Sequence, residues 1–246
     1  MRQLLFHQTS FDTADLRDGS EFFAEAKGDD NLVLKAAEAN LVRTIMSHPV
    51  LRNSLVGALQ RSTQVWWHAG VTDPFITDRY KQPGDIDLLL CEKPRPDESV
   101  VMEFKRVKVT ITGEHQAQVN RLADVGKGVR QANALRELGF FQTYLCILTV
   151  VGAVRQTAHN PLCRGVTAET THDFGDTKTF SKIVEFPDRE DLHPDVGIVF
   201  LELVQPTGKD YRDHGTIRVC VDQKASPQRQ SGELTNKINQ YSSKTP

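Results

Sequence analysis

Short apolar runs alternate with segments of helical spacing along the central part of the chain. Runs bounded by Pro, Gly or Asp are typical of strands, and apolar residues that recur every three or four positions are typical of helices. The pattern predicts, in chain order, a helix at 31–47, strands at 62–69, 86–91 and 99–111, a helix at 122–138 and a strand at 140–151. This order indicates an α/β fold with helices packed on a sheet.

The rest of the chain divides into three segments around this central domain, which is expected at 31–151. Residues 1–30 hold seven acidic residues against three basic ones and form an acidic N-terminal segment. Residues 152–222 either extend the sheet or form a small lobe. Residues 223–246 are rich in Ser, Gln, Lys and Pro and are predicted to be partly disordered. Within 152–222, two further strands are predicted, at 196–206 and 216–221.

Acidic residues flank two of the predicted strands. Asp85 and Asp87 stand at the start of the strand at 86–91, and the next strand contains the triplet Glu103-Phe104-Lys105. Side chains alternate along a strand, so Glu103 and Lys105 share one face. A symmetric hairpin places Asp87 opposite Phe104, and a one-residue adjustment places it beside Glu103 or Lys105, with Cβ atoms about 5 Å apart. A hairpin with a polar outer face explains Glu103 and Lys105, but it explains Asp85 and Asp87 less well.

Two carboxylates and an ammonium group at one sheet surface form a poor core and a good site for a divalent metal ion. Mg²⁺, for which Mn²⁺ can substitute, binds carboxylate and carbonyl oxygens and keeps several waters. A bound metal lowers the pKa of a water and offsets the charge of a phosphate. A nearby lysine can orient that water or neutralise developing charge. The three side chains therefore indicate hydrolysis of a phosphodiester.

This arrangement of an acid, a short gap and Glu-x-Lys at the end of an apolar strand resembles the PD-(D/E)XK nuclease superfamily. The resemblance implies an α/β, restriction-endonuclease-like α-β-β-β-α-β core, in which helices flank a mixed central sheet, followed by a β-containing C-terminal extension. It implies that Asp87 and Glu103 are metal ligands and that Lys105 is the catalytic lysine. The backbone carbonyl of Phe104 is a further implied ligand.

The same resemblance implies roles for two more residues. Glu38, on the first predicted helix, is implied as a third acidic metal ligand, and Gln131, on the second, as a catalytic residue. A solvent-facing glutamate explains Glu38 equally well. The chain departs from the name-giving pattern because no Pro-Asp pair stands at the first acid, where Pro83 precedes Gly84 and Asp85, and Asp85 therefore remains a rival of Asp87 as the first ligand.

Basic residues are concentrated near these positions, although the net charge is −2. Residues 105–136 hold seven basic residues against two acidic ones. A nucleic-acid backbone would have to lie there, and DNA is favoured over RNA as the partner. An ordinary solvated helix face explains the two helical residues, Lys127 and Arg130, at least as well. The predicted nucleic-acid-binding residues are Arg106, Lys108, Lys127 and Arg130.

The cysteines and the termini restrict the cellular setting. Cys91 and Cys146 lie in apolar strands and are expected to be free buried thiols, and no Cys-x-x-Cys occurs. Neither a signal-peptide pattern nor an apolar run of membrane-spanning length occurs, so a cytoplasmic protein without a membrane partner is expected. The sequence has no Gly-Lys-Ser/Thr phosphate loop, so any ATP-driven step would need a partner.

Three functions remain open at this point. The first is a Mg²⁺-dependent nuclease, for which a homodimer, or a helicase or ATPase partner, and a role in antiviral defence follow from analogy with the superfamily alone. The second is a catalytically silent or partner-dependent subunit that binds nucleic acid. The third is an unrelated α/β binding protein whose polar strand face has no catalytic meaning. Metal-dependent cleavage separates the first from the others, and retention of nucleic acid separates the second from the third.

Overall fold

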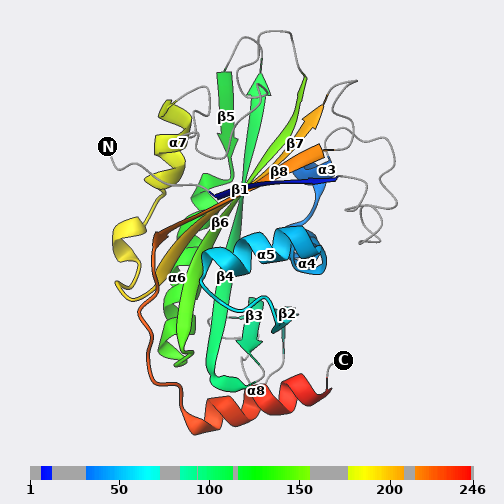
Figure 1. Cartoon of the computed structure of the whole chain (residues 1–246). Helices are drawn as coiled ribbons and strands as arrows, with labels where there is room; N and C mark the ends of the chain where they lie inside the picture. The colour runs from blue at the N-terminus through cyan, green and yellow to red at the C-terminus, as the bar shows by residue number, and fades with distance from the viewer. Residues whose placement is uncertain are drawn as a thin grey trace.

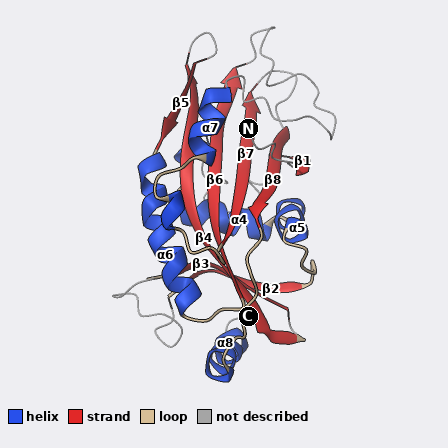
Figure 2. Cartoon of the chain, turned by 90° about the vertical axis from the view of Figure 1, so that its left-hand side faces the viewer, coloured by secondary structure: helices blue, strands red, loops and turns tan. Residues whose placement is uncertain are grey.

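The fold is an open, mixed eight-stranded sheet with helices on both faces (Figures 1 and 2). The computed structural model describes residues 7–12, 32–72, 84–92, 94–112, 116–155, 177–207 and 214–244. The strands run in the order β1-β8-β7-β6-β4-β3-β2, and β5 pairs with β4 beside β3. The strands are β1 (His7–Asp12), β2 (Val65–Val71), β3 (Ile86–Glu92), β4 (Arg95–Thr112), β5 (Gln116–Asn120), β6 (Gln142–Arg155), β7 (Gly197–Thr207) and β8 (His214–Gln223).

The centre of the sheet is parallel and its margins are antiparallel. β4, β6 and β7 pair in parallel, whereas β2–β3, β3–β4, β4–β5, β7–β8 and β1–β8 are antiparallel. Parallel strands need crossover connections, and here α6 connects β4 to β6 and α7 lies between β6 and β7, both on one face of the sheet, while α4 and α5 cover the other face. The helices are α3 (Leu32–Lys35), α4 (Glu38–Ser47), α5 (Pro49–Ala58), α6 (Val125–Glu137), α7 (Thr177–Val184) and α8 (Gly232–Lys244).

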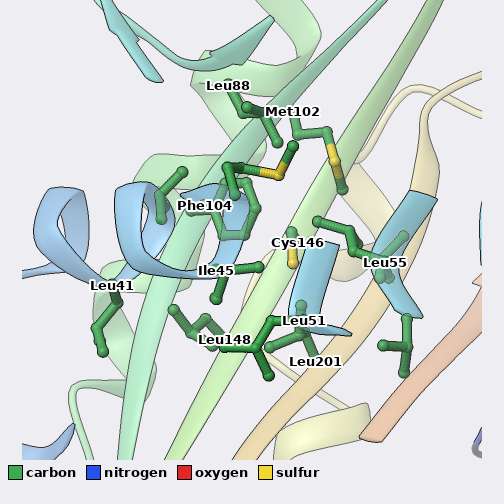
Figure 3. Close-up of a cluster of buried hydrophobic side chains, with 14 of the residues drawn as sticks. Leu41, Ile45, Leu51, Leu55, Leu88, Met102, Phe104, Cys146, Leu148 and Leu201 are labelled. Carbon is green, nitrogen blue, oxygen red and sulfur yellow. The ribbon is translucent and has the colours of Figure 1, made fainter. Parts of the chain in front are cut away.

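The largest apolar cluster lies between the sheet and the pair α4–α5 (Figure 3). Met102 and Phe104 of β4 and Leu41 and Ile45 of α4 are at most 1% exposed. The opposite face of the sheet carries two separate clusters, one under α6 and α7 and one under α8. Burying one large apolar side chain contributes about 1.5–3 kcal/mol relative to exposure. These clusters therefore hold β4 in place on both of its faces.

The helix predicted at 31–47 is divided into two. α3 ends at Lys35, and α4 begins at Glu38 after Ala37, whose backbone is extended (ψ 152°). Pro49, which was expected to lie beyond the last turn, starts a further helix instead. Proline is favoured at the first position of a helix because its missing N–H has no partner there in any case, and His48 accepts a hydrogen bond from the N–H of Leu51. Glu38 therefore lies in the first turn of a helix and not in its middle.

The prediction of a disordered C-terminal tail was wrong for residues 224–244. They end in helix α8, which packs across the end of the sheet beneath β2, β3 and β4 (Figure 1). Ser231 starts the helix by accepting the N–H of Leu234, and Leu234 and Ile238 lie four positions apart on its buried side. Gln230 is also buried and donates to the carbonyl of Pro96. Polar composition concealed a short amphipathic pattern with a good cap.

The C-terminal strands extend the sheet and do not form a separate lobe. β7 pairs with β6, and β8 pairs with β7 and with β1, which comes from the predicted acidic N-terminal segment. Cys91, Cys146 and Cys220 are buried and form no disulfide among the described residues, and Cys163 lies outside those residues. Trp66 and Trp67 pack against different apolar clusters. Among the described residues, no helix is long and apolar enough to cross a lipid bilayer.

Candidate functional site

The edge of β4 that faces β3 and β5 is open over a few residues in the middle of the strand. The pairing of β3 with β4 ends at Leu88↔Met102, and the pairing of β5 with β4 begins at Lys108↔Asn120. Between these pairs, the backbone groups of β4 on this edge have no strand neighbour in the described part of the chain. An unpaired backbone N–H that is buried costs free energy unless a side chain accepts it. Two carboxylates do so here.

Asp87 provides the first of these carboxylates. Its Oδ2 accepts a hydrogen bond of 2.7 Å from the N–H of Phe104. The register Leu88↔Met102, continued by one residue, places Asp87 opposite Glu103, and a bulge between Leu90 and Glu92 separates this register from that of the hairpin tip. Asp87 and Glu103 therefore face the same side of the sheet. This is the one-residue adjustment that the sequence allowed.

Glu38 provides the second carboxylate. Its Oε2 accepts a hydrogen bond from the N–H of Arg106, and its Oε1 lies 3.9 Å from Lys105 Nζ. Glu38 comes from α4, on the face of the sheet opposite to Lys105, and the open edge of β4 lets its carboxylate reach both groups. The break before α4 is what places Glu38 at this edge.

Glu103 and Lys105 project from β4 toward α6, between the two apolar clusters on that face. Lys105 Nζ donates to Glu103 Oε1 and, at 2.8 Å, to the carbonyl oxygen of Phe104. Glu103 is 1% exposed, and no donor among the described residues reaches its buried second oxygen, Oε2, although a hydrogen bond between the Asp87 and Glu103 carboxyls helps to lower the pKa of Asp87. A buried carboxylate oxygen without a donor is costly, which makes it a candidate ligand for a cation.

The four charged groups are unbalanced. Burial, and then the charge of Asp87, raise the pKa of Glu103 well above its usual value. Burial is also the largest cause of the raised pKa of Asp87 and of Glu38, and the charge of Lys105 opposes it in both. The pKa of Lys105 is raised because Glu103, Asp87 and Glu38 outweigh its burial. Three carboxylates surround one ammonium group, so the site favours additional positive charge.

The donor set agrees with a hard cation such as Mg²⁺, because it consists of carboxylate oxygens and one backbone carbonyl. The geometry, however, is that of an ion-paired cluster: in the described part of the chain, no three His, Cys, Asp or Glu side chains form a ready metal-binding group. The Lys105 ammonium donates hydrogen bonds to two oxygens that the resemblance assigns to a metal, Glu103 Oε1 and the Phe104 carbonyl. A metal bound by these oxygens would have to displace Lys105 Nζ from them.

Helix α6 shapes the site through a glycine that sequence reasoning missed. A Cβ added to Gly128 would lie 2.5 Å from Lys105 Cγ and 3.2 Å from Lys105 Cε, so the lysine stem passes directly over this position. Glycine in the middle of a helix costs about 1 kcal/mol relative to alanine. That cost at Gly128 was the signal in the sequence, and close packing on Lys105 is its structural reason.

The other residues predicted on α6 lie around the same helix. Gln131 is half-buried, whereas Lys127 and Arg130 are exposed. Lys127 lies 4.0 Å from Asp124, and Arg130 lies 3.9 Å from Asp188. In the described part of the chain, these two acids, and not the four charged groups, are the ion-pair partners of Lys127 and Arg130. Gln131 stays a predicted catalytic residue whose role the geometry leaves open.

The basic residues after Lys105 form a separate group. Arg106 is 7% exposed and Lys108 is half-buried. The pKa of Arg106 is lowered by burial and then by Arg121, and the pKa of Lys108 is lowered by burial and then by Arg106 and Arg121. Arg121 was not among the predicted binding residues. Its place directly after the strand that pairs with β4 brings it to this group.

The rival first ligand, Asp85, lies outside the cluster of hydrogen bonds. Its side chain is exposed, and its charge contributes to raising the pKa of Asp87. Asp87, in contrast, is bonded to the backbone of β4. The geometry therefore brings Asp87, Glu103, Lys105 and Glu38 together and leaves Asp85 at the rim.

Comparison of the chain with protein-family models, with curated proteins and with solved structures found no match in any of the three.

Proposed function

We propose that the chain is a divalent-metal-dependent nuclease that hydrolyses phosphodiester bonds, with DNA as the favoured substrate. The observation that carries the proposal is the cluster of three buried or half-buried carboxylates around one lysine at the open edge of β4. Such an excess of negative charge is expensive to bury without a function. The order of α4, β2, β3, β4, α6 and β6 supports a restriction-endonuclease-like core, with β5 inserted before α6.

Asp87, Glu103 and the carbonyl of Phe104 are the groups that would hold the metal, with Glu38 as the third carboxylate. The buried Glu103 Oε2, which has no partner in the described part of the chain, is the feature that fits a cation best. A bound Mg²⁺ or Mn²⁺ supplies a water of lowered pKa and offsets charge on the phosphate.

Lys105 is the proposed catalytic lysine. Its pKa is raised, so the amine carries its proton at neutral pH and acts as a hydrogen-bond donor and positive charge, not as a base. When Nζ leaves Glu103 Oε1 and the Phe104 carbonyl, it can donate to a phosphate oxygen or to the attacking water. Preorganised donors of this kind contribute about 10²–10³-fold to the rate. The packing of its stem against Gly128 limits where Nζ can move.

The test is cleavage of supercoiled plasmid, linear duplex, single-stranded DNA and RNA with Mg²⁺, Mn²⁺ or EDTA. We expect metal-dependent cleavage that falls by about 10²-fold or more in Lys105→Ala and in Asp87→Asn. Lys182→Ala, an exposed lysine on α7, is the matched control for the lysine, and Asp85→Asn is the control for the acid. Both controls should retain activity.

Three results would contradict this proposal in different ways. Cleavage that survives Lys105→Ala and Asp87→Asn would place the active site elsewhere. Loss in Asp85→Asn with activity retained in Asp87→Asn would exchange the roles of the two acids. Absence of cleavage by the unmodified chain with either metal would remove the nuclease assignment.

A second function has one observation in its favour. Because Lys105 already lies on the oxygens that a metal would need, the cluster can be stable as an ion-paired, non-cutting arrangement. The chain would then be a nucleic-acid-binding subunit that is silent or needs a partner for activity. Retention of DNA in a gel shift without cleavage, unchanged by Mg²⁺, would support this function over the first.

A further inference from the structure

Beside the candidate active site, three cations converge where β4 meets β5. Arg106 and Lys108 are two positions apart on β4, so they project from the same face, about 7 Å apart along the strand. Lys108 pairs with Asn120, and Arg121 is the next residue along the chain. The charges of these residues act on one another, since Arg121 lowers the pKa of both Arg106 and Lys108. Like charges gathered in this way repel and need an anion between them.

Arg106 supplies an independent observation that points to a ligand. Only 7% of the residue is exposed, yet its Nε and Nη1 have no hydrogen-bond partner among the described residues. A buried guanidinium is normally paired, because its donors lose their water on folding. The nearby carboxylate, Glu38, is already engaged: its oxygens accept the backbone N–H of Arg106 and lie beside Lys105 Nζ.

The number of charges and donors indicates the class of anion. A phosphodiester carries one negative charge, whereas a terminal phosphomonoester carries about −1.5 to −2 at pH 7 and presents three acceptor oxygens. Two guanidinium groups can each bind such a group in a bidentate manner, and the lysine adds a point charge. Three cations, one of them desolvated, match the doubly charged group better than a single diester.

We propose that Arg106, Lys108 and Arg121 form a binding site for the terminal phosphate of a polynucleotide, next to the cluster of Asp87, Glu103 and Lys105. This proposal rests on the proposed function for the identity of the polynucleotide and deepens it, because it assigns the enzyme a preference for phosphorylated ends. Lys105 and Arg106 are consecutive and project from opposite faces of β4, so an end held by Arg106 would reach the catalytic lysine around the open edge of the strand, as Glu38 does. Cleavage would then be favoured near the end of the strand.

The test measures binding in EDTA, where no metal-dependent cleavage occurs. Internally fluorescein-labelled single-stranded oligonucleotides with a 5′-phosphate, a 3′-phosphate or hydroxyls at both ends are titrated with the full chain, and anisotropy gives Kd. We expect one phosphorylated end to bind about tenfold more tightly than hydroxyl ends. Inorganic phosphate should compete with the phosphorylated oligonucleotide and reduce that ratio. The two phosphorylated oligonucleotides distinguish a 5′ site from a 3′ site.

Variants assign the preference to the three cations. Lys108→Gln and Arg121→Gln should each lower the ratio of hydroxyl to phosphorylated Kd several-fold, and neither residue is fully buried. Arg106→Gln should remove the preference for phosphorylated ends. Because Arg106 is buried, this substitution also affects folding, and Lys108→Gln and Arg121→Gln are therefore the variants that test the site. Arg229→Gln, at an exposed residue, and Lys237→Gln, at a half-buried residue of α8, should keep the ratio.

The outcomes separate this proposal from the proposed function. Equal Kd values for all three oligonucleotides, or a ratio unchanged in both Lys108→Gln and Arg121→Gln, would overturn the terminal-phosphate site even if the chain cleaves DNA. A preference that depends on these residues in a chain that never cleaves would uphold the site while the nuclease assignment fails. A preference lost equally in Lys237→Gln and Arg229→Gln would show general charge attraction and overturn the site as well.

Discussion

Two buried charged clusters lie in the same sheet, and they differ in how their charges balance. Between β7 and β8, Glu202 accepts a 2.9 Å hydrogen bond from Arg218 Nη1, and Arg218 Nε donates to Gln8 of β1. One negative and one positive charge face each other there, and both residues are at most 8% exposed. At the open edge of β4, Asp87, Glu103 and Glu38 share one ammonium group.

The difference in charge balance indicates a different role for each cluster. A balanced buried pair can hold two strands in register, although its net contribution to stability is small, because desolvation offsets the attraction. An unbalanced cluster destabilises the fold, and the raised pKa of its three carboxyls expresses that cost. Such a cost is typical of functional sites, where stability is given up for chemistry. The same sheet therefore carries one ionic cluster that suits a structural role and one that suits the proposed metal site.

The largest expected effect is in the balanced pair. Glu202→Ala leaves Arg218 buried without its carboxylate, and we expect the free energy of unfolding to fall by about 3–5 kcal/mol. Urea denaturation at pH 7 measures it. A loss below about 1 kcal/mol would contradict the comparison, because the Glu202–Arg218 pair would then contribute no more to stability than an exposed ion pair.

A smaller effect is expected at Gly128, which controls the place of Lys105. Gly128→Ala inserts a Cβ 2.5 Å from Lys105 Cγ, and we expect a destabilisation of about 1–3 kcal/mol through overpacking, with loss of cleavage as Nζ is displaced. Gly57→Ala on α5 is the matched control, because its Cβ would meet nothing within 4 Å. The control should gain about 0.5–1 kcal/mol from helix propensity and keep its activity. Equal stability of both variants would show that Lys105 moves freely.

The smallest effect has the opposite sign and sharpens the comparison most. Glu103→Gln removes one charge from the unbalanced cluster, and in EDTA at pH 8 we expect a gain of about 1 kcal/mol in the free energy of unfolding. Because the pKa of Glu103 is raised in the folded protein, the folded state binds more protons than the unfolded state above pH 4.5. Stability from this group is therefore greatest below that pH and is lost as the pH rises through its folded pKa.

The gain in Glu103→Gln should accordingly shrink when denaturation is repeated at pH 5.5. Glu233→Gln is the control, because the pKa of this exposed carboxyl is lowered by Lys237, and its replacement should bring no gain at either pH. A gain that is the same at both pH values would mean that packing, and not charge, distinguishes the variant. A loss at pH 8 would mean that Glu103 is as structural as Glu202.

The central fold could be predicted from the sequence because its elements have strong periodic patterns. The strands over Leu88–Leu90 and Phe104–Val107, and helix α6, lie where apolar spacing placed them. The elements that were missed depend on local devices with little apolar content. Pro49, which was expected to lie beyond a helix, starts helix α5, and Ser231 caps a helix in a segment whose composition is polar.

The sequence predicted which residues form the candidate site, but it did not predict how these residues contact one another. Asp87, Glu103 and Lys105 were identified from position and chemistry, but Asp87 was left opposite Phe104 or beside Glu103 or Lys105. The observed register includes a bulge, which depends on how two strands pack and not on either strand alone. Gly128 and Arg121 were missed because their roles depend on contacts with β4. The sequence does not show that α6 packs on β4 at Lys105 or that the strand before Arg121 pairs with β4.

The bulge between Leu90 and Glu92 also determines where this chain could change in length over evolution. Beyond the bulge, toward the hairpin tip, added or deleted residues leave the register of Asp87 untouched. Between the bulge and Asp87, one inserted residue would turn every side chain of that stretch to the other face and send the carboxylate into the apolar layer of Met102 and Phe104. Descendants of this chain are therefore expected to vary the length of the tip freely and to keep the distance from Asp87 to Leu90 fixed.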